Sequence, residues 1–163
     1  MDECEIAISK IAESYREVVS GGLDLDRIEG SSDSAIDAMA DSQNASAIPA
    51  SAREIYRFIG TRSGTFLSIC SFELWELDAE EKEVAMESLS DVASELNPIV
   101  DPIHMLVIMQ SDAGYHAVID GVDLDEPDPP VWIVFEGGTI ERRDSVTSLF
   151  SQIARSVQDV LDL

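Results

Sequence analysis

The stretch with the clearest capacity for chemistry is an acidic, proline-rich run at residues 120–130, which reads Asp-Gly-Val-Asp-Leu-Asp-Glu-Pro-Asp-Pro-Pro. Alternating carboxylates are typical of calcium loops, which also require glycine at the sixth position and glutamate at the twelfth. Counted from Asp123, the sixth residue is Asp128 and the twelfth is Val134, so the calcium pattern fails. We therefore predict no metal site here and a solvated acidic loop, with a loose, weak cation site as the alternative.

Histidine and cysteine are the other residues that could carry a reaction. The only histidines, His104 and His116, lie in apolar, strand-like runs, and neither belongs to an HExxH pattern. Cys4 and Cys70 have no CxxC neighbour, which predicts two free thiols in a cytoplasmic protein. No nucleophile elbow or glycine-rich phosphate loop occurs. We predict no catalytic residue, no cofactor and a protein that is not an enzyme. The alternative, a hydrolase, would need a closed pocket with convergent polar groups.

Tryptophan and arginine suggest two further roles. Trp75 and Trp132 lie in runs that resemble strands, which predicts core packing for both, with an exposed binding anchor as the alternative. Arg53, Arg57 and Arg62 form a basic cluster along one helical segment. We predict a solvated face for this cluster, with internal salt bridges to the acidic remainder of the chain as the second reading.

The charge of the whole chain limits its partners. Its 163 residues hold 33 acidic and 10 basic residues, a formal net charge of -23, and the acids are spread over the full length. Binding to nucleic acid or to an acidic lipid surface is disfavoured, because both depend on Lys and Arg. A basic protein partner is favoured by long-range attraction, although high charge also serves solubility alone.

The elements that must position these residues follow from hydrophobic periodicity and turn signals. We predict helices over residues 4–20, 33–43, 49–60, 79–96 and 146–161. We predict strands over residues 65–70, 72–77, 103–110, 115–120, 131–136 and 139–143. Ser51 with Glu54 has capping-box spacing, and Asp144 precedes the last helix as its expected cap. Consecutive strands with short turns predict an α+β fold, mainly an antiparallel β-sheet with helices packed on it.

Three segments together resemble the SUKH superfamily, which contains fungal cell-wall-assembly regulators and many bacterial immunity proteins. Residues 48–60 are similar to its proline, helix and glycine opening, and residues 105–120 to its strand pair. Residues 128–150 are similar to its aspartate-proline-proline-valine-aromatic strand, its acidic-glycine turn and its closing helix. The turn at Ser111–Tyr115 departs from the family's glycine-rich pattern, and residues 1–47 match no part of it.

The resemblance implies one SUKH-like unit over residues 48–163, preceded by an N-terminal helical segment at residues 1–47. It also implies a non-enzymatic bacterial protein of the cytoplasm that neutralises a toxin, in many cases a nuclease, by stoichiometric occlusion. The alternative is a regulator or scaffold of the same fold without a toxin partner. From charge and expected exposure, we predict that the basic partner binds at Asp120, Asp123, Asp125, Glu126 and Asp128, with Trp132 as an anchor.

Overall fold

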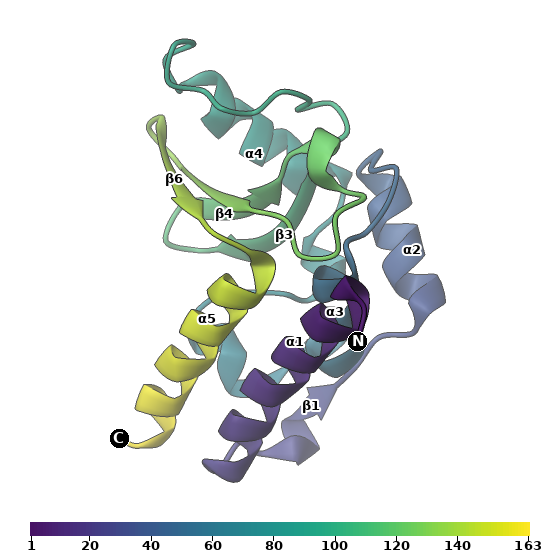
Figure 1. The fold of residues 1–163 in the computed structure, drawn as a ribbon. Coiled ribbons are helices and arrows are strands. Elements are labelled where there is room, and N and C mark those ends of the chain that lie inside the picture. Colours follow the sequence, from purple (N-terminus) through teal and green to yellow (C-terminus); the bar gives the residue numbers. More distant parts are fainter.

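A four-stranded antiparallel sheet stands at the centre of the computed structural model, which describes residues 1–163 (Figure 1). Its strands are neighbours in chain order: β3 (Leu106–Ser111), β4 (Tyr115–Ile119), β5 (Val131–Phe135) and β6 (Thr139–Arg143). The runs that form β3, β4 and β5 are rich in β-branched and aromatic residues, which pack well on a pleated surface. Short turns join β3 to β4 and β5 to β6, as predicted.

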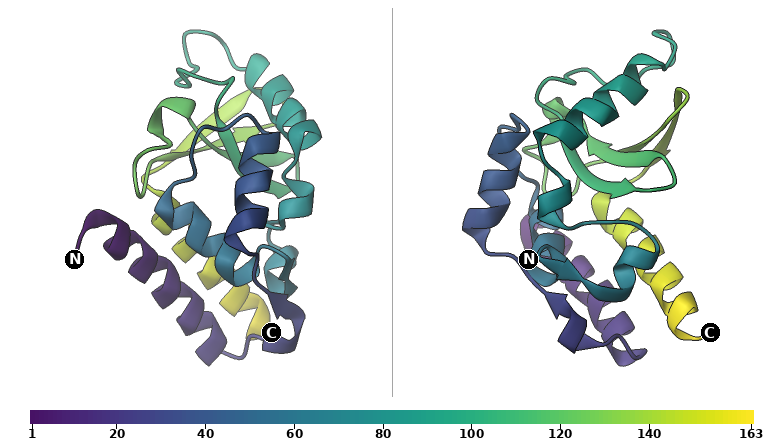
Figure 2. Two further views of the ribbon diagram at one scale, coloured as in Figure 1. Left: turned by 90° about the vertical axis from the view of Figure 1, so that its right-hand side faces the viewer. Right: turned by 180° about the vertical axis from the view of Figure 1, so that it is seen from behind.

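Helices cover both faces of this sheet (Figure 2). The five helices are α1 (Glu3–Ser20), α2 (Asp33–Ser42), α3 (Ala50–Ile59), α4 (Ala79–Ser90) and α5 (Val146–Leu161). Helix α4 packs on one face against β3 and β5, and α5 lies on the other face with α1 and α3 beside it. The predicted α+β fold is therefore confirmed. None of the five helices is both long and apolar enough to cross a membrane.

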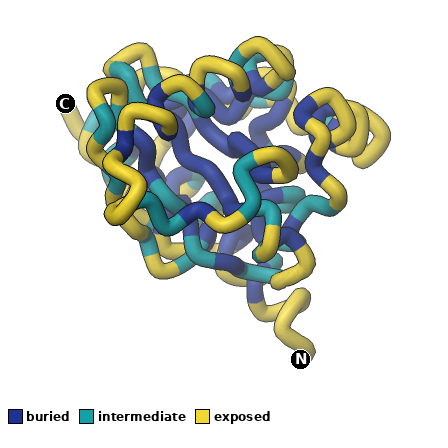
Figure 3. The backbone as a smooth tube through the Cα atoms, turned by 90° about the horizontal axis from the view of Figure 1, so that it is seen from above, coloured by how far each residue is buried: buried dark blue, intermediate teal, exposed yellow.

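The N-terminal helix shares the hydrophobic core with the rest of the chain. Ile11 and Val18 of α1 are buried in the main cluster, and α1 packs along α5 and α3. Figure 3 shows buried residues at the centre and an exposed first turn of α1 at the N-terminus. A small second sheet is formed by the antiparallel pairing of β1 (Ile28–Glu29) with β2 (Arg62–Ser63).

The segment from residue 64 to residue 77 is not extended, so the predicted strands over residues 65–77 are wrong. It forms two short 3₁₀ helices, η2 (Gly64–Ser68) and η3 (Leu74–Glu76), with a single bridge from Ser71 to Gln110 between them. Two of its large apolar residues, Phe66 and Phe72, are buried for a different reason, because both pack against Phe150 of α5. Packing on a helix therefore accounts for the apolar residues that suggested a strand.

Three helix ends also differ from the predictions. Pro49 precedes α3 without a side-chain cap, and the Ser51 hydroxyl is buried with no hydrogen-bond partner, so the predicted capping box is wrong. Ser145, not Asp144, caps α5 by accepting a hydrogen bond from the backbone N–H of Ser148. Helix α4 ends at Ser90 and not at residue 96.

The outer edge of strand β3 is covered by groups from three other segments. The Gln43 side chain donates to the carbonyls of Val107 (3.0 Å) and Leu77 (2.9 Å) and accepts from the Val107 N–H (2.8 Å). The backbone of Ser71 exchanges two hydrogen bonds with that of Gln110. The Tyr56 hydroxyl donates to the carbonyl of Ile108, where the β3–β4 register is irregular. These bonds give hydrogen-bond partners to backbone groups that would otherwise be unpaired at the edge of the sheet.

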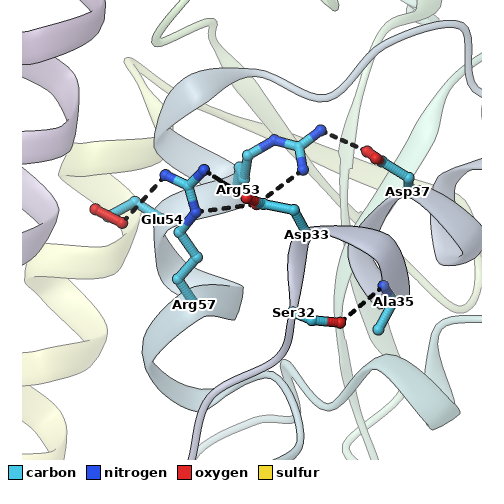
Figure 4. A network of polar contacts seen from close by, with 7 residues as sticks. All are labelled: Ser32, Asp33, Ala35, Asp37, Arg53, Glu54 and Arg57. Atoms are coloured by element: carbon cyan, nitrogen blue, oxygen red, sulfur yellow. Dashed lines mark hydrogen bonds and ion pairs between the residues drawn. The ribbon is translucent and has the colours of Figure 1, made fainter.

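Arginines of α3 form ion pairs with aspartates in the first half of α2 (Figure 4). Arg57 donates two hydrogen bonds to Asp33, at 3.0 and 3.1 Å, and Arg53 contacts Asp33 at 3.1 Å and Asp37 at 2.6 Å. Hydrogen bonds from Arg57 and then from Arg53 lower the pKa of the Asp33 carboxyl. For Arg53 and Arg57, the internal salt bridges considered as the second reading are therefore present. Arg62 instead donates to the backbone carbonyl of Asp26.

Replacing Asp33 by asparagine is expected to lower the free energy of unfolding at pH 7. The folded-state pKa of Asp33 lies below its unfolded value. Its contribution is therefore present above the unfolded pKa and is lost as the pH falls through the folded pKa. Urea unfolding at pH 7 and near pH 3 should show a deficit at pH 7 that shrinks in acid. Asp41→Asn, on the same helix at an exposed position, is the control. A deficit that is equal at both pH values would contradict the charge argument.

Candidate partner-binding surface

The loop that joins β4 to β5 starts at an internal anchor. Asp120 is only 3% exposed, and its carboxylate accepts hydrogen bonds from the backbone N–H groups of Val100 (2.7 Å), Asp101 (2.9 Å) and Val122 (3.3 Å). These bonds tie residues 99–104 to the short 3₁₀ helix η4 (Gly121–Asp123). The expectation that Asp120 is exposed is wrong, because its charge is satisfied by backbone groups of its own chain.

The other end of the loop is held by two helix N-termini. The Pro127 carbonyl accepts from the Ser51 N–H (3.0 Å) at the start of α3. Asp128 accepts from the N–H (3.0 Å) and the hydroxyl (2.6 Å) of Thr147 in the first turn of α5, where a negative charge is favoured by the helix dipole. The Asp128 carboxylate thus fixes this end of the loop, and Asp128 itself is half-buried.

The remaining acids of the predicted set project from this anchored loop. Asp125 and Glu126 are exposed, and Asp123 is half-buried. Burial, followed by the negative charge of Asp120, raises the pKa of Asp123. Because both ends of the loop are fixed, these three side chains are offered to a partner from a backbone that needs little ordering on binding.

A second acidic segment, not identified from the sequence, lies beside this loop. Glu3, in the first turn of α1, lines a hollow of about 420 Å³ together with Glu126, Asp128 and the basic side chain of Lys10. The acids of this first turn are explained locally by a capping box, in which Asp2 and Glu5 bond each other's backbone N–H groups. No spacing signal could have revealed this proximity, because the two segments are more than a hundred residues apart in the chain.

Exposed apolar side chains adjoin the same loop. Val100 is 73% exposed, Ile103 is 61% exposed and Val122 is 56% exposed. All three lie on the two segments that Asp120 ties together. Apolar side chains bordered by charged ones are a usual composition for a protein-binding surface. We call Asp123, Asp125 and Glu126, with Val100, Ile103 and Val122, the loop surface.

The two tryptophans differ in how far they match the predicted core packing. Trp132 is half-buried on β5 and packs against the core, with the guanidinium of Arg142 6.0 Å from the ring centroid. Core packing is therefore confirmed only in part for Trp132, and its role as an anchor stays a prediction. Trp75 is 70% exposed on η3, so core packing is wrong for that residue.

The histidines and cysteines lie in separate environments. His104 Nδ1 is 2.9 Å from Asp101, and His116 Nε2 is 2.6 Å from Glu81 of α4. His116 is buried, and its Nδ1 has no hydrogen-bond partner. Both cysteines are free thiols as predicted, and burial raises the pKa of Cys70 to about 12. No group of three or more His, Cys, Asp or Glu side chains is arranged to hold a metal ion.

The chain matches no family model, no curated protein and no solved structure.

Proposed function

We propose that this chain is a binding protein of the SUKH type that neutralises a basic protein partner, a toxin domain such as a nuclease, by stoichiometric occlusion. The single observation that carries the proposal is the anchored acidic loop. Asp120 and Asp128 use their carboxylates to fix its two ends, while Asp123, Asp125 and Glu126 remain available to a partner. Side chains that are already in place bind at a lower entropic cost.

The net charge of -23 supports the same proposal. A nuclease must carry positive charge to hold its substrate, so an acidic partner is attracted to it over a long range. Complementary potentials raise the association rate and fix the orientation of the encounter. The exposed apolar side chains of the loop surface supply area that becomes buried after that encounter.

The first experiment is capture of partners from the protein's own cell lysate on the tagged chain, at about 50 mM and about 500 mM salt, because exposed charge pairs are screened over this range. The expected result is one stoichiometric basic protein that is held more weakly at high salt. A stoichiometric partner without basic character, or no partner in a culture that expresses adjacent toxin genes, would favour the regulator or scaffold alternative.

Neutralising the loop surface is expected to weaken the captured complex about tenfold, a loss of about 1.4 kcal/mol. The variant is Asp123→Asn, Asp125→Asn and Glu126→Gln together, and the dissociation constant is measured by calorimetry. The matched control removes three exposed acids elsewhere, by Glu83→Gln, Glu87→Gln and Asp112→Asn. An equal loss in both triple variants would mean that net charge alone acts and would reject the loop as the binding site.

A further inference from the structure

We propose that Trp75 forms a second contact site, which receives an arginine side chain of a protein partner on the face of its indole ring. Trp75 lies on η3, away from the β4–β5 loop in the chain, and is 70% exposed. Tryptophan is enriched among the residues that dominate binding energies, and this side chain presents most of its surface to solvent. The inference rests on the proposed function only for the basic nature of the partner.

The indole ring of Trp75 is held in place before any partner arrives. Its N–H donates to Oε1 of Glu73 at 2.9 Å, and Glu73 is itself only 6% exposed. The other oxygen of Glu73 accepts from the N–H and the hydroxyl of Ser63, both at 2.8 Å. A surface side chain with a buried anchor loses little conformational freedom on binding, which is the condition for an effective contact residue.

The acidic surroundings of Trp75 favour binding of a cation on its ring. The three groups that donate to Glu73 are all neutral, so no cation of the chain bonds this buried carboxylate. A carboxylate that accepts the indole N–H increases the electron density of the ring, whose faces attract cations. Glu76 and Asp78 follow directly, and residues 63–81 contain no lysine or arginine. The arginine nearest to Trp75 in the sequence, Arg62, donates to the backbone carbonyl of Asp26.

The other tryptophan of the chain, Trp132, already has an arginine of the same chain over its ring. Arg142 lies over the ring of Trp132, with its guanidinium carbon 6.0 Å from the ring centroid. Trp75 has no such cation from its own chain, although it is the more exposed of the two rings. An arginine is favoured over a lysine because its planar guanidinium can stack on the face of the ring, whereas an ammonium acts only as a point charge.

The test uses NMR of the whole chain, in which the two tryptophans provide two indole N–H signals, assigned with Trp75→Leu. The probe is a capped peptide of four arginines separated by glycines, with lysine and citrulline peptides of the same length for comparison. The expected result is a saturable shift of the Trp75 signal with the arginine peptide, a smaller shift with lysine, and none with citrulline. Trp75→Leu should weaken arginine-peptide binding about two- to fivefold.

Val84→Ala removes apolar surface at another exposed position and should leave the affinity for the arginine peptide unchanged. An unmoved Trp75 signal, an equal response to citrulline, or an unchanged affinity in Trp75→Leu would overturn the inference. The effect of Trp75→Leu should persist in the chain whose loop acids are neutralised. If the loop variant still binds the captured partner fully while Trp75→Leu weakens the peptide, the loop proposal fails and the Trp75 site stands.

Discussion

Replacing Phe150 by alanine is expected to lower the free energy of unfolding by about 3–5 kcal/mol. Phe150 is fully buried, and its ring contacts Phe66 at 5.6 Å and Phe72 at 5.9 Å between centroids. The substitution removes the surface on which residues 64–72 fold, and a segment of 3₁₀ turns has few other bonds to keep its shape. Urea unfolding, followed by circular dichroism, measures the loss.

Phe150→Leu is the control for this prediction, because it keeps most of the buried volume and should cost less than about 1.5 kcal/mol. If alanine costs no more than leucine, the segment must collapse onto α5 and fill the space. The three aromatic rings would then contribute little to the stability of the core.

The second large effect is expected at Gln43, where leucine should lower the free energy of unfolding by about 2–4 kcal/mol. The side chain is 1% exposed and bonds both backbone groups of Val107 as well as the Leu77 carbonyl. Leucine fills a similar volume but leaves these three groups without partners in a region that water does not reach. Thermal and urea unfolding report the change.

Gln152→Leu, at an exposed position of α5, should change the stability by less than about 0.5 kcal/mol and is the matched control. A cost below about 1 kcal/mol for Gln43→Leu would show that the edge of β3 finds other hydrogen-bond partners. Gln43 would then contribute through packing and not through its hydrogen bonds to β3.

The sequence was sufficient for elements whose burial is periodic over several turns or that alternate along a strand. The apolar stripe predicted for α5 is buried at Val146, Leu149, Phe150, Ile153 and Val157, whereas its last members, Val160 and Leu161, are only half-buried at the end of the helix. Residues 65–77 were predicted wrongly because apolar runs of three to six residues fit a strand and a packed turn equally well. What distinguishes the two is the contact with Phe150, which lies about eighty residues later in the chain.

The candidate surface was predicted less completely than the fold, for a related reason. Charge and proline content indicated the acidic loop at residues 120–130. They did not show which carboxylates serve the protein's own backbone. Asp120 bonds Val100 and Asp101, and Asp128 bonds Thr147, all about twenty residues away. Such pairings depend on tertiary geometry.

The two edges of the central sheet have different consequences for growth by strand addition. At β3, the Gln43 amide, Ser71 and Tyr56 occupy the backbone groups that another strand would need. At β6, the edge is open but bears Glu141, Arg142 and Arg143, and charged side chains oppose edge-to-edge aggregation. A chain or partner that extended this sheet could therefore do so only at β6, where a matching pattern of charge would be required.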